Sequence, residues 1–257
     1  MYKSILILIL SASVALVRPV VGQTADDLEA AVRNAPDGNV EMVFAARPEV
    51  WGDGHRNTWV RESGSLNRRC ECTNGPIRVT LHVRGGDVES ITRRVGGEPA
   101  PATRNDLGRV PASSAASYLM KLAQQSGSSG TANAALEAAV EADSARLWPG
   151  LLTISKDVSR PTRVRKTAVF WLSQEAAEEA APVLEDLAAE KDEDLEVREQ
   201  AIFALSQLPD GRGVPHLLRV AREQHDPRII RKAFFWLGQT DDPRALELFE
   251  EVLTSGG

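Results

Sequence analysis

The C-terminal part of the chain repeats one helical pattern three times. The segment at residues 164–174 returns at 197–207 and again at 229–239, at offsets of 33 and 32 residues. Each copy begins with Val or Ile, has Ala in its middle, then Phe and Leu, and ends with Gln. Such regular spacing predicts a stack of helix pairs, a solenoid, in which each repeat packs on its neighbours. A stack of this kind offers an extended binding surface and has no reaction chemistry of its own.

The first 22 residues have the features of a cleavable signal peptide. Lys3 provides a positive start, residues 5–17 form an apolar core, and Val20-Val21-Gly22 provides small residues for cleavage. An uncleaved membrane anchor is the alternative, but this core is too short to cross about 30 Å of hydrocarbon at about 1.5 Å per residue. We therefore expect an exported protein, periplasmic or extracellular, whose mature chain does not insert into a membrane.

The charge of the chain is acidic overall and unevenly placed. There are 30 Lys and Arg residues against 36 Asp and Glu, a net charge of −6. This balance argues against nucleic acid as a partner of the whole chain. Residues 23–111 contain 12 Arg and no Lys, whereas the excess of acid lies in residues 112–257. The length allows two modest domains, each with its own core.

Residues 23–110 predict a small α+β module. A short helix is expected from Thr24, and strands are expected over 40–46 and 58–61. The clearest pattern is a β-hairpin at 77–95, in which alternating apolar residues lead to Gly85-Gly86 and a returning strand. The Pro-rich residues 98–111 predict a linker or irregular crossing, so residues 111–257 form the helical array.

A second apolar pattern precedes each of the three repeats and recurs once after the last. Each unit therefore predicts an outer helix followed by an inner helix, and the paired apolar positions are Leu151 and Ile154, Leu184 and Leu187, Leu217 and Val220, and Phe249 and Val252. Asp194 and Asp226 stand at the expected N-caps of two inner helices, whereas the first unit has Pro161-Thr162 there.

This arrangement resembles HEAT repeats, in particular the short bacterial type that is also found in phycobilin lyases. The resemblance covers about residues 145–254. It implies a mainly α fold, with a C-terminal HEAT-like α-solenoid preceded by a small module that contains the β-hairpin. It also implies protein binding through the concave face of the solenoid.

The buried stripe of the inner helices follows from a helical wheel. Val197, Ala204 and Leu205 fall within one arc, and Trp171 and Trp236 align with Ala204 in the repeat. We therefore predict that both Trp side chains belong to the core.

The rest of the inner-helix surface contains aromatic and basic residues. Phe170, Phe203 and Phe235 share one repeat position outside the buried stripe. They form either an exposed ladder for a ligand or rings that fill the grooves between repeats, and we favour the second because bare Phe rows promote aggregation. Basic residues on the concave arc favour an acidic segment of another protein, and the alternative is a solvated face with scattered charge. The predicted partner-binding residues are Arg165, Lys166, Arg198, Arg231 and Phe234.

Cys70 and Cys72 are the only cysteines, and export would place them in oxidising surroundings. We predict a structural disulfide or two buried thiols. A redox pair is an alternative, because a Cys-x-Cys ring is strained and therefore easily reduced. Asp53, His55 and His82 provide further ligand types for zinc, but their spacing matches no standard zinc site, so we predict no metal.

The sequence contains no nucleophile elbow, zinc-protease motif or phosphate-binding Gly-rich loop. We therefore expect an exported scaffold or adaptor that binds a protein partner, with no catalytic residues and no cofactor. One alternative is a lyase-like or cofactor-handling enzyme on the same array, which requires a deep cavity lined by an acid, an Arg and aromatic residues. The other is a redox or metal element at Cys70 and Cys72.

Overall fold

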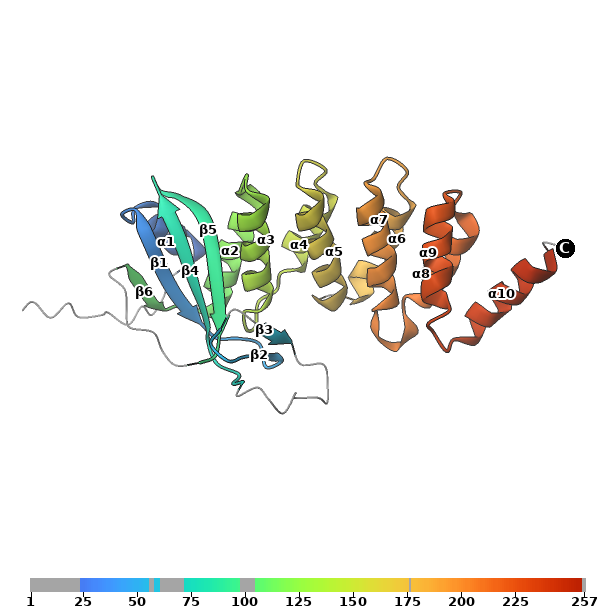
Figure 1. The fold of residues 1–257 in the computed structure, drawn as a ribbon, viewed down its shortest axis with the longest axis horizontal. Helices are drawn as coiled ribbons and strands as arrows, with labels where there is room; N and C mark the ends of the chain where they lie inside the picture. Colours follow the sequence, from blue (N-terminus) through green and yellow to red (C-terminus); the bar gives the residue numbers. More distant parts are fainter. Residues whose placement is uncertain (1–23, 56–57, 61–71, 98–104, 176, 256–257) are drawn as a thin grey trace, which may run out of the picture.

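The computed structural model describes residues 24–55, 58–60, 72–97, 105–175 and 177–255. Figure 1 shows a β-sheet module at the N-terminal end of an elongated molecule, with helices stacked side by side away from it. The last helix, α10 (Pro243–Ser255), ends the stack at the opposite end. Within the described residues no helix is both long and apolar enough to cross a membrane.

The N-terminal module begins with α1 (Ala25–Arg33), as predicted. The Thr24 side chain accepts a hydrogen bond from the Asp27 backbone N–H, and the Asp27 carboxylate accepts one from the Thr24 N–H. This capping box satisfies two backbone donors at the start of the helix. Leu28 and Val32 are buried one helical turn apart, so one face of α1 packs into the core.

A four-stranded sheet with the order β5-β4-β1-β6 forms the centre of the module. The predicted hairpin is confirmed as β4 (Ile77–Arg84) and β5 (Asp87–Val95), joined at Gly85 and Gly86, which both have positive φ. The strand β1 (Gly38–Phe44) pairs antiparallel with β4. On β1 and β4 buried side chains alternate with half-buried or exposed ones, so helices cover one face of the sheet and the other face is open.

Three short strands complete the β structure. The prediction of an irregular crossing is wrong at β6 (Asp106–Arg109), which pairs parallel with β1 at the edge of the sheet. Its four residues include Gly108 at positive φ and are too short to show an alternating pattern. A separate ribbon consists of β2 (Val50–Gly52) and β3 (Thr58–Val60).

Two helices join the module to the array. The helix α2 (Ala112–Gln125) packs against α1, and α3 (Ser129–Val140) packs against α2 and β5. Arg93 of β5 donates hydrogen bonds to the carboxylates of Glu137, at 2.5 Å, and Glu141, at 3.0 Å. Burial raises the pKa of Glu141 to about 7, although Arg93 opposes this shift. Arg47 forms an ion pair with Glu175, so the module also contacts the array directly.

The array consists of paired helices in two layers. The inner layer, defined here as α3 with α5 (Thr162–Glu175), α7 (Leu195–Ser206) and α9 (Pro227–Leu237), forms a continuous series of neighbours. The outer layer contains α4 (Trp148–Lys156), α6 (Ala177–Ala189) and α8 (Val214–Glu223). A short 3-10 turn, η1 (Pro209–Gly211), precedes α8. The predicted N-caps are confirmed, since Asp194 and Asp226 each accept a hydrogen bond from a backbone N–H two residues later.

Candidate partner-binding surface

The structure corrects the predicted concave arc at three of its five residues, Arg165, Arg198 and Phe234. Arg165 and Arg198 were expected to be exposed, but they are only 3% and 4% exposed. In the first two repeats this side chain points toward the outer helix, where it bonds to the backbone carbonyl of Ser155 or Ala188. Arg165 and Arg198 therefore lie in the interior of the stack and do not face a partner.

Arg165 connects three consecutive parts of the array. Its Nε and one terminal nitrogen donate hydrogen bonds to the Ser155 carbonyl near the end of α4, at 3.1 and 2.9 Å. The other terminal nitrogen donates to the Glu193 carboxylate, at 2.7 Å, just before α7. A guanidinium has enough donors to satisfy an orphan helix carbonyl and a carboxylate together.

Arg198 repeats this arrangement one unit later. Its Nε donates to the Ala188 carbonyl in α6 at 3.0 Å, and its terminal nitrogens donate to Asp226 at 3.4 Å and to Gln224 at 3.2 Å. The aligned residue of the third unit is Ile230, so the connection ends there. These arginines hold the repeats together.

The other three predicted residues have different environments. Lys166 is half-buried and forms an ion pair with Glu196 at 2.8 Å. Arg231 is exposed and has no ion pair or hydrogen bond with the described residues, so its role in binding stays a prediction. The ring of Phe234 packs on Phe249 of α10 with centroids 5.6 Å apart, so its assignment to the concave arc is wrong.

Aromatic side chains form a continuous row across α5, α7 and α9, which we call the aromatic row. Phe170 stacks on Phe203 with centroids 6.3 Å apart, and Phe203 contacts Trp236 at 5.0 Å. Trp171 extends the row at one end and Phe235 at the other, with edge-to-face contacts. The interpretation that Phe rings fill the grooves between repeats is therefore confirmed at Phe170 and Phe203.

Part of this row remains accessible to solvent. Phe235 is 55% exposed, because the described chain has no further inner helix beside it. Trp171 and Trp236 are half-buried, so the prediction that they are core residues holds only in part. Ala204 is fully buried at the same repeat position, but an indole is much larger and reaches the inner-layer surface. The indole N–H of Trp236 is buried without a hydrogen-bond partner among the described residues.

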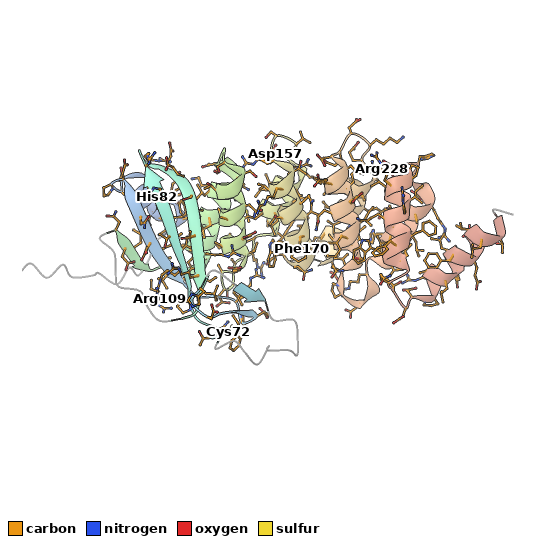
Figure 2. All side chains as sticks on the ribbon, viewed as in Figure 1. Cys72, His82, Arg109, Asp157, Phe170 and Arg228 are labelled. Atoms are coloured by element: carbon orange, nitrogen blue, oxygen red, sulfur yellow. The ribbon has the colours of Figure 1, made fainter. Side chains whose placement is uncertain are left out.

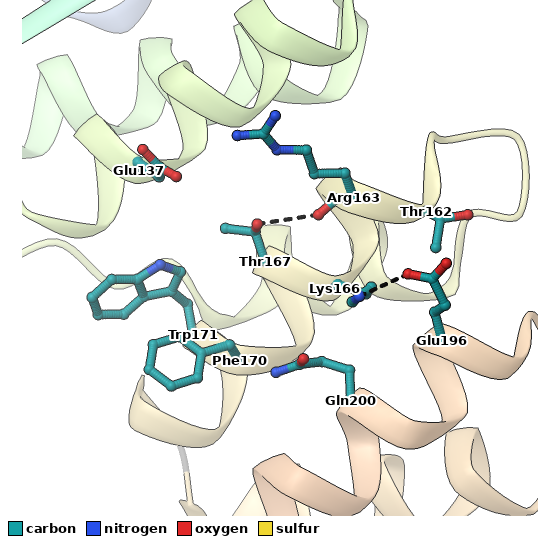
Figure 3. Close-up of a pocket in the computed structure, with 9 residues that line it drawn as sticks. All are labelled: Glu137, Thr162, Arg163, Lys166, Thr167, Phe170, Trp171, Glu196 and Gln200. Atoms are coloured by element: carbon teal, nitrogen blue, oxygen red, sulfur yellow. Dashed lines mark hydrogen bonds and ion pairs between the residues drawn. The ribbon is translucent and has the colours of Figure 1, made fainter.

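A groove of about 670 Å³ lies along α5, between α3 and α7. Figure 3 shows Phe170 and Trp171 at one end, Thr167 near the middle, and Arg163 extended toward α3. Glu137 of α3 and Gln200 of α7 form the two sides. The groove is open along the surface, and Figure 2 shows the labelled Phe170 near the centre of the array.

Charge alternates from one inner helix to the next. The ion pairs Lys166–Glu196 and Lys232–Glu199 connect neighbouring helices at 2.8 and 3.0 Å. Arg163 and Arg231 are exposed at opposite ends of this series, and neither guanidinium has a partner among the described residues. The exposed or half-buried charges of the inner layer are basic on α5 and α9 and acidic on α7, namely Arg163 and Lys166, Glu196 and Glu199, and Arg228, Arg231 and Lys232.

The sequence contained a signal for this surface that the helical wheel missed. Arg163, Glu196 and Arg228 share one repeat position, which lies one residue before the buried Val or Ile. The predicted arc was rotated toward the outer layer, so it included two structural arginines and omitted Arg163. The aligned Phe positions indicated the correct face.

The cysteine and histidine predictions fall partly outside the described residues. Cys72 is disulfide-bonded, and Cys70 lies outside the described residues. His82 lies on the open face of the sheet, where its Nδ1 is 3.1 Å from the Asn39 side-chain oxygen. Among the described residues no three side chains of the His, Cys, Asp or Glu type come together as metal ligands.

Comparison with known protein families adds to this geometry. A family model described as HEAT repeats matches residues 148–235 and, in a second placement, residues 188–256. These residues contain the helix pairs from α4 to α10. A search of curated proteins finds no match to this chain.

Proposed function

Because residues 148–256 are HEAT repeats, we propose that this protein is a scaffold or adaptor that binds a segment of another protein on its inner-layer surface. The observation that carries this proposal is the aromatic row, which is accessible at its edges and flanked by charges. Aromatic side chains supply large contact areas, and they are enriched among the residues that dominate protein–protein binding energies.

The unpaired cations define the ends of the proposed binding site. Arg163 on α5 and Arg231 on α9 are two helix spacings apart, about 16–20 Å if each spacing is about 8–10 Å. An extended peptide covers that distance in about five to six residues. The matching segment has apolar side chains over the aromatic row and a carboxylate near each end.

A binding role is favoured over the lyase-like alternative. An acid, an Arg and aromatic residues do meet at the α5 groove, as a cofactor-handling site requires. Small-molecule sites, however, usually enclose most of the ligand surface, whereas this groove is open along its length. Native mass spectrometry of the purified protein tests the alternative, because a stoichiometric small ligand would support it.

We also propose that the protein acts outside the cytoplasm. The signal-like residues 1–22 support export, and the disulfide bond at Cys72 is the kind of bond that persists in oxidising compartments. The test is the intact mass of the protein from cell-envelope and medium fractions. A chain beginning after residue 22 supports export, and full-length protein confined to the cytosol contradicts it.

Site-specific photo-crosslinking tests the binding surface. A benzophenone amino acid replaces Phe235, which is 55% exposed on the inner layer, or Leu253, which is 80% exposed on α10. We expect the Phe235 probe, and not the Leu253 probe, to crosslink one protein in envelope extract. The crosslink should weaken with Arg231→Glu and persist with Arg146→Glu, a charge reversal at another exposed Arg. Equal crosslinking from both probes would contradict the proposal.

A further inference from the structure

A row of arginines crosses the open face of the N-terminal sheet. Arg94 of β5 lies directly opposite Arg78 of β4, and Arg78 lies opposite Val43 of β1. Val43 in turn pairs with Arg109 of β6. Residues in register across a sheet place their side chains on the same face. The three arginines, which we call the arginine row, therefore extend over all four strands.

Burial shows that this row is on the solvent side. The neighbours Ile77, Val79, Val95 and Val110 are buried, so the alternating residues between and beside them point away from the core. Arg94 and Arg109 are exposed, and Arg78 is half-buried. Figure 2 shows the labelled Arg109 toward the end of the sheet opposite His82.

Within the described part of the chain, no acidic side chain pairs with this row. None of the three guanidiniums has an ion pair or hydrogen bond with the residues that the structure describes. By contrast, Arg84 at the hairpin end of β4 pairs with Glu89 at 3.4 Å, and Arg93 on the covered face pairs with Glu137 and Glu141. Like charges directly opposite each other in a sheet are destabilising. An unpaired Arg–Arg pair is therefore unfavourable for folding alone and favourable for binding an anion.

We propose that the arginine row binds an acidic segment of a protein, with carboxylates on alternate residues, separately from the inner-layer surface. Strands lie about 4.8 Å apart, so the row from Arg94 to Arg109 extends about 14 Å. In an extended peptide, three carboxylates on alternate residues extend about 13–14 Å. Arginine binds carboxylates through two parallel hydrogen bonds, which gives this contact both strength and orientation.

The surroundings favour a short acidic segment over a nucleic acid. Next to the arginine row lies a row that contains Glu41 and Asp106, together with the hydroxyls of Thr80 and Thr92. These two carboxylates and the net charge of −6 oppose a long phosphate backbone. A peptide with three carboxylates can lie along the arginine row alone.

The test is fluorescence anisotropy of the intact protein with a labelled peptide in which three glutamates alternate with threonine. We expect saturable binding that weakens with added salt. Arg78→Gln and Arg94→Gln should each weaken it about three- to fivefold, as loss of one exposed charge pair does. The matched control is Arg84→Gln, which removes a paired Arg on the same sheet and should change binding less than twofold.

Three results would overturn the proposal. The first is equal affinity for a peptide with glutamine in place of glutamate. The second is equal loss of binding with Arg84→Gln, which would indicate general attraction to the sheet. The third is tighter, row-dependent binding of a single-stranded oligonucleotide, which would identify a nucleic-acid surface. Urea unfolding provides an independent check of the like-charge repulsion between Arg94 and Arg78. Removing that repulsion with Arg94→Gln should leave the free energy of unfolding unchanged or raise it.

Discussion

Arg198 provides the sharpest test of how the array is held together. Its side chain is 5% exposed and donates to Ala188, Gln224 and Asp226. Removing one partner of a buried ion pair typically costs about 3–5 kcal/mol. Asp226 keeps its ion pair with Arg228, so only part of that cost applies. The Ala188 carbonyl loses a donor, at about 1–3 kcal/mol. We expect Arg198→Ala to lower the free energy of unfolding by about 2–4 kcal/mol.

Urea unfolding followed by circular dichroism at 222 nm measures this change. The matched control is Arg231→Ala, an exposed Arg on the next inner helix, which should change stability by less than about 0.5 kcal/mol. Arg198→Lys should recover part of the loss, since it keeps the charge but not the three-way geometry. If Arg198→Ala and Arg231→Ala had equal, small effects, the guanidinium of Arg198 would face solvent and its buried hydrogen bonds to Ala188, Gln224 and Asp226 would not exist.

Three further predictions concern other parts of the fold. The raised pKa of Glu141 means that the folded state binds its proton more tightly, so its contribution to stability is largest below pH 4.5 and is lost as pH rises through 7. Between pH 5 and pH 8 the wild type should lose about 2 kcal/mol relative to Glu141→Gln, and parallel pH profiles would refute this. Phe203→Ala removes the ring contacts with Phe170 and Trp236 and should lower the free energy of unfolding by about 2–3 kcal/mol in urea. A decrease below about 1 kcal/mol would contradict the packing of the aromatic row. Gly213→Ala places a Cβ against the Leu205 carbonyl oxygen and should cost about 1–3 kcal/mol, whereas an unchanged melting curve would mean that α8 begins differently.

The contacts of Arg165 and Arg198 distinguish the first two repeat units from the third. Arg165 and Arg198 each connect the end of an outer helix to the start of the next inner helix. Ile230 replaces this arginine in the third unit, and α10 follows with Leu246, Val252 and Leu253 exposed. The described end of the stack is therefore the part with the weakest internal connections, and hydrogen exchange should be fastest there.

Much of the architecture follows from local sequence patterns. The offsets of 33 and 32 residues predicted the helix pairs, and the family match over residues 148–256 confirms HEAT repeats. Alternation over 77–83 and the following Gly85-Gly86 predicted the hairpin. These features depend on residues close together in the chain, where the periodicity of a helix or strand and the chemistry of caps and turns dominate.

The candidate surfaces depend on contacts that local patterns do not contain. A helical wheel gives the direction in which the Arg198 side chain points, but not what lies there. The end of α6 and the start of α9 lie in that direction, so Arg198 donates hydrogen bonds to Ala188 and Asp226 and is shielded from solvent. In the arginine row, the hairpin places Arg94 beside Arg78, but Arg109 joins the row only because β1 pairs with β4 and β6 pairs with β1 across a long stretch of sequence. The sequence by itself determined the repeats, the hairpin and the caps. Tertiary packing alone decided which charges are buried and which remain free, because desolvation and ion pairing depend on neighbours in space.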